Sequence, residues 1–424
     1  MIHGVRGAPD IGPPDAKLLW QRLEGMARDL LERYDYEEIR TPVFERAELF
    51  VRGIGEGTDI VEKEMYTFQD KGGESLTLRP EGTAPAVRWY LERGRAEPGS
   101  LVKVYYIGPM FRHERPQAGR FRQFHQIGAE AIGVAAPEVD AEVIEALADL
   151  FGALGLRDVT LHLNSIGDAV CRPGFRERFA AYMRERKDEL CLDCHARLEK
   201  NPLRIMDCKN PRCQAAVAGA PKAAESLCGP CRAHFARVRE LLEALAIPYA
   251  LNDRLVRGLD YYTRTTFEFT AAGLGAQNAI AGGGRYDGLI ETLGGPPTPA
   301  IGFAIGMERV ILCLKGGERQ APAAREGVYV ASADGAGARR APLVARELRR
   351  AGIRTVTNLE GRSLKAQMRR ADSEMFRYCV ILGEQELQDE QAAVRDLETR
   401  EQSPVTLAQL STWLTEHARK GGAG

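Results

Sequence analysis

Residues 108–128 read GPMFRHERPQAGRFRQFHQIG, and this stretch decides how the chain is interpreted. Strand-forming residues at both ends predict two strands, Val102–Arg112 and Gln123–Ile132, joined by a polar, basic loop. Four arginines fall within 11 residues there: Arg112, Arg115, Arg120 and Arg122. A guanidinium binds phosphate through bidentate, charge-assisted hydrogen bonds. The stretch therefore indicates arginines presented to a phosphate-bearing ligand, although taken alone it also fits a solvated basic hairpin.

The returning strand carries a second pattern. Because alternate residues of a strand share one face, Gln126, Gly128 and Glu130 should point the same way. A glycine between two polar side chains predicts free space for a ligand on that face.

Three further stretches are ambiguous one at a time. Residues 257–264 read RGLDYYTR, where paired tyrosines beside an arginine could simply cap a sheet edge. Residues 302–310 read GFAIGMERV, where Arg309 could stack on an adenine ring or the glycines could only serve helix packing. Residues 78–83 read LRPEGT, a strand end whose acid could hold an ammonium group.

In this order, the four stretches together resemble the motifs of class II aminoacyl-tRNA synthetases. The hairpin resembles motif 2, residues 302–309 resemble motif 3, and the helix predicted at Ala16–Tyr34 with the strand up to Pro42 resembles motif 1, the family's dimer element. Four stretches resemble segments that are peculiar to the histidyl enzymes: residues 51–59, 78–83, 257–263 and 282–286. The resemblance implies an enzyme that activates histidine with ATP and esterifies it onto tRNA(His).

The resemblance also implies an ATP site with Arg112, Glu114, Arg120 and Arg309. Arg112 would hold the α-phosphate and the histidine carboxylate, Glu114 would contact adenine, and Arg309 would stack on adenine and reach the γ-phosphate. Arg257 would stabilise charge on the α-phosphate, where other class II enzymes place a metal ion. Arg112, Arg257 and Arg309 are thus the expected catalytic residues.

The implied histidine site consists of Glu81, Gly82, Thr83, Arg112, Gln126, Glu130, Arg257, Tyr261 and Tyr262. Glu81 and Thr83 would hold the α-amino group, and Glu130 with the two tyrosines would bind the imidazole. A neutral imidazole has one donor and one acceptor, so a carboxylate and a hydroxyl can both be satisfied. Arg115 and Gln117 would touch the acceptor end of tRNA(His). Mg²⁺ would bridge the phosphates of ATP, and the first motif implies a homodimer.

The expected fold class is α+β, with a class II synthetase antiparallel sheet flanked by helices over residues 1–320. A helical, cysteine-bearing insertion is expected at about 168–247, and an α/β anticodon-binding domain at 327–424 after a Gly-, Ala- and Pro-rich linker. The formal net charge of −1 gives no argument for RNA binding from overall basicity. Phosphate contacts would instead come from local arginines of the last domain: Arg339, Arg340, Arg346, Arg349, Arg350, Arg369, Arg370 and Arg377.

Six of the nine cysteines lie between Cys191 and Cys231, which favours a reduced compartment over disulfides. No apolar run approaches the roughly 20 residues of a membrane span, and residues 1–7 lack a signal-peptide core, so a cytoplasmic location is expected. The CxxC spacing makes Cys191, Cys194, Cys228 and Cys231 candidate ligands of a non-catalytic Zn²⁺. The alternative is an insertion of reduced cysteines whose metal is lost or was never needed.

Two other functions fit parts of the pattern. A histidine-binding regulatory subunit of ATP phosphoribosyltransferase would lack the last domain and tend to lose catalytic arginines, whereas Arg112, Arg257 and Arg309 are all present. A class II synthetase for another amino acid, such as threonine, proline or glycine, does not fit Glu130 with Tyr261 and Tyr262. A protein that only binds RNA would not need the three arginines together.

Overall fold

The computed structural model describes residues 2–94, 99–117, 119–275, 278–316 and 325–420. The chain divides into two compact units, residues 1–318 and 319–424, each with its own hydrophobic core. Among the described residues, no helix combines the length and the apolar character that crossing a bilayer requires.

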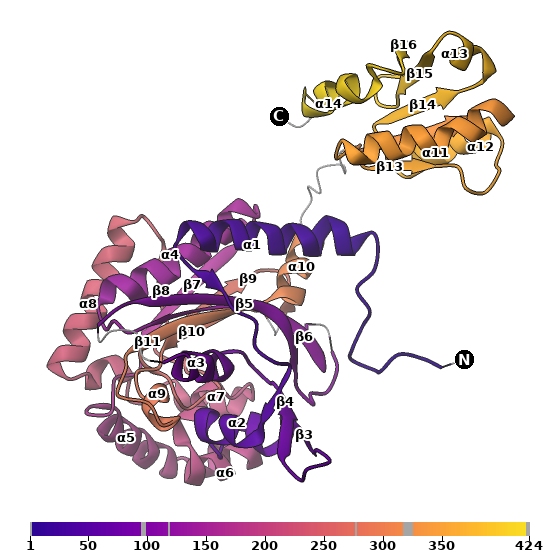
Figure 1. The fold of residues 1–424 in the computed structure, drawn as a ribbon. Coiled ribbons are helices and arrows are strands. Elements are labelled where there is room, and N and C mark those ends of the chain that lie inside the picture. Colours follow the sequence, from indigo (N-terminus) through magenta and orange to yellow (C-terminus); the bar gives the residue numbers. More distant parts are fainter. Residues whose placement is uncertain (1, 95–98, 118, 276–277, 317–324, 421–424) are drawn as a thin grey trace. The chain divides into compact units, whose positions relative to one another are not determined.

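An eight-stranded sheet forms the centre of the first unit (Figure 1). Its strands lie in the order β1 (Glu37–Glu38), β5 (Val102–Phe111), β6 (Gln123–Ile132), β11 (Ala300–Gly306), β10 (Ala279–Arg285), β9 (Thr263–Ala271), β7 (Val159–Ser165) and β8 (Tyr249–Leu251). Only the outer pairs β1–β5 and β7–β8 are parallel. Strands β5 and β6 pair over their full length, from Val102 opposite Ile132 to Phe111 opposite Gln123, which places the arginine loop at one end of the sheet.

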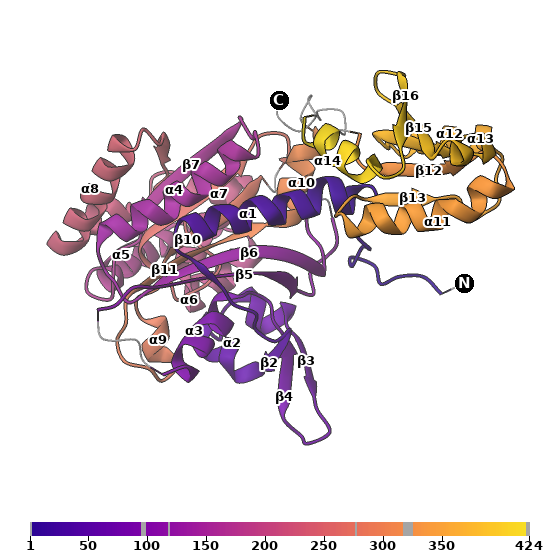
Figure 2. The same ribbon diagram turned by 45° about the horizontal axis from the view of Figure 1, so that its top comes forward.

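Helices cover both faces of this sheet (Figure 1). One face carries α1 (Arg22–Arg33), α4 (Pro137–Ala153), α8 (Gly229–Ala244) and α10 (Met307–Gly316) over the largest core. The other face carries α2 (Ala47–Ile54), α3 (Thr83–Glu92) and α9 (Leu289–Thr292). A small sheet of β2 (Phe44–Arg46), β4 (Ser75–Leu78) and β3 (Tyr66–Gln69) projects beyond α2 (Figure 2). Strand β4 leads through residues 79–82 to α3, whose first residue, Thr83, donates a hydrogen bond to Glu130 of β6 in the central sheet.

Between β7 and β8 the chain forms a helical segment with α5 (Arg172–Arg184), α6 (Leu192–Lys200), α7 (Pro211–Val217) and then α8. Phe175, Phe179, Leu198 and Ile205 are buried in a core of its own, together with Cys194, Cys208 and Cys213.

The second unit is a five-stranded sheet in the order β13 (Thr355–Thr357), β12 (Val328–Ser332), β14 (Tyr378–Leu382), β15 (Gln391–Asp396) and β16 (Gln402–Thr406). Its helices are α11 (Gly335–Arg350), α12 (Leu364–Ser373), α13 (Glu384–Gln388) and α14 (Leu410–Lys420). Residues of α11 and α14 share one core with the sheet, and residues of α12 share another. The sheet is thus covered by helices on both faces.

The predicted α+β class is confirmed, and several local predictions need correction. The helix expected at Ala16–Tyr34 begins as a π-helical segment, Ala16–Gln21, before α1. The three consecutive glycines of residues 282–286 predict a turn, but these residues lie mostly in the central strand β10. After a strand at Arg377–Leu382 the sequence predicts a helix that ends near Arg419, but β15 and β16 come before the last helix, with β15 paired to β14 and β16 paired to β15.

Candidate active site

A cavity in the first unit collects residues that are far apart in the sequence. Of the residues predicted to bind ATP or histidine, those that line it are Glu81, Thr83, Arg112, Glu114, Arg120, Gln126, Arg257, Tyr261, Tyr262 and Arg309. They come from the start of α3, the β5–β6 hairpin, the loop before β9, and the start of α10. Gly82 and Glu130 lie just outside the lining. The assigned roles stay predictions, but the residues that would share a ligand do share one cavity.

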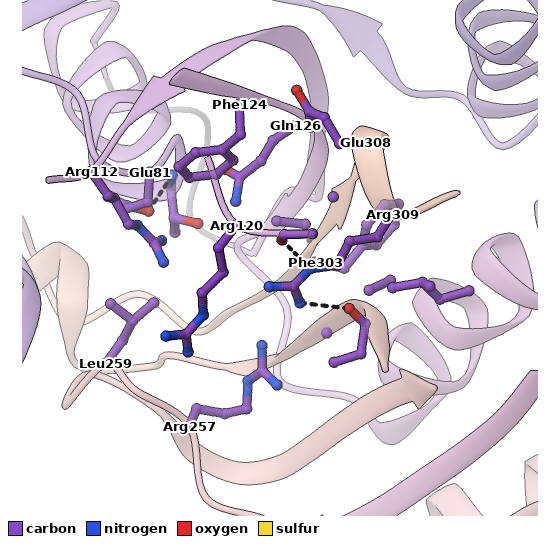
Figure 3. Close-up of a pocket in the computed structure, with 18 of the residues that line it drawn as sticks. Glu81, Arg112, Arg120, Phe124, Gln126, Arg257, Leu259, Phe303, Glu308 and Arg309 are labelled. Carbon is purple, nitrogen blue, oxygen red and sulfur yellow. Dashed lines mark hydrogen bonds between the residues drawn. The ribbon is translucent and has the colours of Figure 1, made fainter. Parts of the chain in front are cut away.

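Four guanidinium groups enter the cavity from different sides (Figure 3). The side chains of Arg112, Arg120, Arg257 and Arg309 point toward the same space. Protein oxygens hold most of them: Arg112 Nε donates to Pro80 O at 2.9 Å, and Arg120 Nε lies 3.1 Å from Glu114 Oε2. Arg309 Nε donates to Gly119 O at 3.0 Å and its Nη1 to Ala279 O at 2.7 Å. Such fixed cations suit a polyphosphate because they need little reorganisation on binding.

Arg257 is held against two neighbouring strands of the central sheet. Its guanidinium forms an ion pair with Glu268 of β9 and lies over Gly282 of β10, where any side chain would overlap it. Burial alone would lower the pKa of Arg257, but Glu268 keeps it raised, so the group stays cationic. Its Nε is buried and has no hydrogen-bond partner among the described residues, and the same is true of Gln126 Oε1. Both atoms are available for a ligand.

Glu130 is fully buried beneath the cavity. Its Oε1 accepts hydrogen bonds from Thr83 Oγ1 at 2.8 Å and from the Tyr106 hydroxyl at 3.2 Å, and its Oε2 accepts one from the Tyr286 hydroxyl at 2.5 Å. Gly302 leaves room for this carboxyl, because a side chain there would overlap Oε2. Burial raises the pKa of Glu130 to about 8, with the three hydroxyl hydrogen bonds opposing the rise. A buried, shared carboxyl of this kind is typical of a recognition site.

The buried carboxyl predicts a pH-dependent stability. Unfolded Glu130 titrates near its ordinary pKa of 4.5 and folded Glu130 near 8, so folding takes up a proton between these values. Its stabilising contribution is complete below pH 4.5 and is lost as the pH rises toward 8, by up to about 1.4 kcal/mol per pH unit. Glu130→Gln cannot titrate at this position. As the pH rises from 5 to 8, its thermal unfolding midpoint should therefore increase relative to that of the unmodified chain. Parallel midpoints in thermal unfolding across that range would rule out this titration.

Glu81 already has two partners in the fold. It accepts hydrogen bonds from the backbone N–H groups of Thr83 at 2.7 Å and Ala84 at 2.9 Å, the first residues of α3. Each carboxylate oxygen has two acceptor positions, so an ammonium group can still bind from the cavity side. Burial raises the pKa of Glu81. Glu81 therefore combines a helix-capping role with its predicted role as a ligand.

The sequence predicted that Gly128 clears space for a ligand, but this prediction is wrong. The ring of Tyr106 fills that space, since a side chain on either Gly128 or Gly82 would overlap it. Tyr106, Tyr286 and Glu268 were not identified from the sequence. Tyr106 and Tyr286 belong to stretches that were singled out, but only the strand pairing shows that both hydroxyls reach Glu130.

The residues predicted to meet tRNA lie outside the cavity. Arg115 lines a neighbouring recess with Arg6, His113 and Arg122, and Gln117 pairs with Arg120 through backbone hydrogen bonds of 2.9 and 3.2 Å. The four candidate zinc ligands do not meet at one point. Cys191 and Cys194 belong to one cluster of potential ligands, and Cys228 and Cys231 to another.

Comparison with known proteins agrees with this arrangement. The family model described as histidyl-tRNA synthetase matches residues 7–310, and the one described as anticodon binding domain matches residues 328–417. The histidine–tRNA ligase of Anaeromyxobacter dehalogenans is 52% identical over 97% of this chain and 98% of its own length. That of Syntrophotalea carbinolica is 50% identical over 99% of both. The crystal structure of the apo S. aureus histidyl-tRNA synthetase has a TM-score of 0.81 and 35% identity, covering 97% of this chain and 99% of that one.

Proposed function

The chain belongs to the histidyl-tRNA synthetase family, whose reaction is the ATP-dependent ligation of histidine to tRNA, and we propose that the cavity described above performs its first step. The observation that carries this proposal is the convergence of Arg112, Arg120, Arg257 and Arg309 beside the Glu130 network in one cavity. The match over nearly the whole length, including the anticodon-binding domain, favours this function over that of a regulatory subunit of ATP phosphoribosyltransferase.

In the proposed step the histidine carboxylate attacks the α-phosphorus of ATP, the P–O bond to pyrophosphate breaks, and pyrophosphate leaves. Arg112 binds both the carboxylate and the α-phosphate, which brings nucleophile and electrophile together. Arg257 binds the α-phosphate oxygens as their charge increases. Arg309 lies against adenine and reaches the γ-phosphate, with Arg120 beside it and Glu114 at the adenine. No covalent enzyme intermediate is required, since positioning and charge stabilisation supply the catalysis.

Histidine is proposed to bind with its ammonium group at Glu81 and Thr83, beside Gly82 and Gln126. Its imidazole would reach Tyr261, Tyr262 and the Glu130 network. Buried Arg257 Nε and Gln126 Oε1 lack a partner among the described residues, and a ligand without matching groups would leave such atoms unpaired, which discriminates against it.

ATP and Mg²⁺ are used generally by this family. The described carboxylates that line the cavity are already engaged: Glu81 with the backbone N–H groups of Thr83 and Ala84, Glu114 with Arg120, and Glu308 with the His125 backbone N–H at 2.9 Å. They provide no dedicated magnesium site, so the ion would be held mainly by phosphates and water and would neutralise phosphate charge. Zinc would be non-catalytic, because none of the residues that line the cavity is a cysteine.

The domain roles follow the same proposal. Residues 1–320 form the catalytic domain with an insertion at about 168–247, and residues 327–424 form the anticodon-binding domain. Arg115 and Gln117 are proposed to contact the acceptor end of tRNA(His). A homodimer is proposed through the first helix and the strand after it.

The tRNA proposal can be tested on α11. Its Arg339, Arg346 and Arg350 are exposed, and Arg349 is also exposed but donates a hydrogen bond to Thr355 O at 2.9 Å. Arg340 lies 3.8 Å from Glu347, and Arg370 and Arg377 of the same unit pair with carboxylates at 2.7 Å. Replacing Arg339, Arg346 and Arg350 with alanine should raise the KM for tRNA(His) about 10–100-fold and reduce the log–log slope of the salt dependence of binding by about two to three. Charging assays at several salt concentrations measure both, and ATP–pyrophosphate exchange should not change.

Arg184→Ala, an exposed position on α5, is the matched control and should leave the KM unchanged. Unaltered charging by the triple variant would remove α11 from the tRNA-binding surface.

A further inference from the structure

Two separate groups of potential metal ligands lie outside the active-site cavity. One consists of Cys191, Cys194, Cys208 and Cys213, and the other of Asp168, Cys171, Cys228 and Cys231. Within each group, one ligand atom from every residue lies within 4.8 Å of all the others. Seven of the nine cysteines, with Asp168, therefore form two sets of four ligands. The sequence had instead suggested one set that combines the two CxxC pairs, and these pairs belong to different sets in the structure.

The first set, called the inner cluster below, joins the elements of the helical insertion. Cys191 directly precedes α6 and Cys194 lies in its first turn, Cys208 follows the 3₁₀ turn Pro202–Asp207, and Cys213 lies in α7. The Sγ atoms of Cys191 and Cys208 are 3.9 Å apart. Tetrahedral zinc with Zn–S bonds of about 2.3 Å requires S···S separations of about 3.8 Å.

Neither disulfides nor simple packing explains the inner cluster. All nine cysteines are free thiols, and a disulfide would need sulfurs only about 2.05 Å apart. Buried cysteines can serve as small apolar residues, but such packing has no reason to direct four sulfurs from three different elements to one point. A helical insertion with a small core gains stability from a structural metal.

The second set, called the base cluster below, joins the two ends of the insertion. Asp168 and Cys171 lie where the chain leaves β7 for α5, and Cys228 and Cys231 lie where it enters α8. Asp168 Oδ1 is 3.5 Å from Cys171 Sγ and 4.0 Å from Cys228 Sγ. Gly167 has φ +71°, and a side chain there would overlap Cys171 Sγ. The turn before Asp168 is thus shaped so that the cysteine sulfur can face the carboxylate.

The base cluster is also next to the proposed histidine pocket. Asp168 Oδ2 lies 3.5 Å from Arg264 Nη2 in β9, and Arg172, the first residue of α5, donates a hydrogen bond to the backbone carbonyl of Tyr262. A metal at this point would hold the start of the insertion, before α5, and its last helix, α8, against strand β9.

We propose that each cluster binds one structural Zn²⁺, the inner cluster through four cysteines and the base cluster through three cysteines and Asp168. Both sets have the four ligands that a closed structural zinc site requires, and neither leaves a position for substrate. The inner site holds α6 and α7 together inside the insertion, and the base site anchors the insertion to the catalytic sheet. This assignment does not depend on the activity of the cavity.

Metal analysis of the purified full-length chain tests the proposal. Elemental analysis by mass spectrometry should find two zinc ions per chain, and titration with a mercurial reagent should release both, detected with a colorimetric zinc indicator. Fewer than about 0.2 zinc per chain, or iron in place of zinc, would overturn the assignment. Because both measurements use the unmodified chain, they do not depend on whether a variant folds.

Variants then test the ligand sets. Cys208→Ser with Cys213→Ser should leave one zinc per chain, and Cys171→Ser with Cys228→Ser should also leave one. Cys313→Ser, a free cysteine in α10 outside both clusters, should leave two. Two zinc ions in either double variant would contradict the corresponding ligand set. Loss of histidine activation with zinc still bound would refute the proposed function but not the zinc sites, so the two proposals fail separately.

Discussion

Arg257→Ala is expected to reduce ATP–pyrophosphate exchange with histidine by about three orders of magnitude. Arg257 is a preorganised cation, held by Glu268 and lying over Gly282, with an Nε that has no hydrogen-bond partner among the described residues. Removing a fixed donor that binds charge developing in a transition state costs about 10²–10³ in rate, and a full cation in a buried site should act at the upper end. The loss should be in kcat rather than in the KM for ATP, because Arg112, Arg120 and Arg309 remain.

Arg254→Ala is the matched control, because Arg254 is exposed and lies three residues earlier in the chain. Its exchange rate should stay within about twofold of the unmodified chain, as expected for a surface substitution. If Arg257→Ala keeps more than a tenth of the exchange rate, another group must stabilise the α-phosphate.

Glu130→Ala is expected to lower kcat/KM for histidine about 10³–10⁴-fold. The change leaves the hydroxyls of Thr83, Tyr106 and Tyr286 without their shared acceptor in a buried site, and it removes the carboxyl that the imidazole network requires. Steady-state exchange at varied histidine concentration measures the loss. The KM for ATP should change little, because the four arginines of the cavity are intact.

Two controls separate recognition from folding. Glu138→Ala removes an exposed carboxylate that pairs with Arg237 on α8, and it should leave kcat/KM unchanged. ATP binding to Glu130→Ala, followed by calorimetry, shows whether the cavity is still assembled. A folded, ATP-binding Glu130→Ala that activates histidine normally would remove Glu130 from the recognition site.

The sequence was most informative where function depends on short, contiguous stretches. The hairpin at residues 108–128 contains its arginines, strands and turn within a local segment, and the structure has β5 and β6 close to the predicted positions. The arginines proposed to bind ATP also come from such stretches, and all of them line the cavity. Gln126 and Glu130 share a face because side chains alternate along a strand regardless of which strands pair with it.

The sequence was least informative where several distant segments meet. Tyr106 and Tyr286 reach the same carboxyl from different strands, 156 residues separate Glu130 from Tyr286, and no local pattern encodes that contact. The cysteines show the same limit. Spacing alone suggested combining Cys191 and Cys194 with Cys228 and Cys231, whereas the path of α5–α8 places these pairs in different clusters and brings Asp168 into one of them.

The most direct test of the central claim is ATP–pyrophosphate exchange by the purified full-length chain with each of the twenty amino acids. The cavity described here predicts exchange with histidine alone, because only an imidazole completes the Glu130 and tyrosine network while the carboxylate meets Arg112. Exchange with another amino acid in place of histidine, or histidine binding without any exchange, would contradict it.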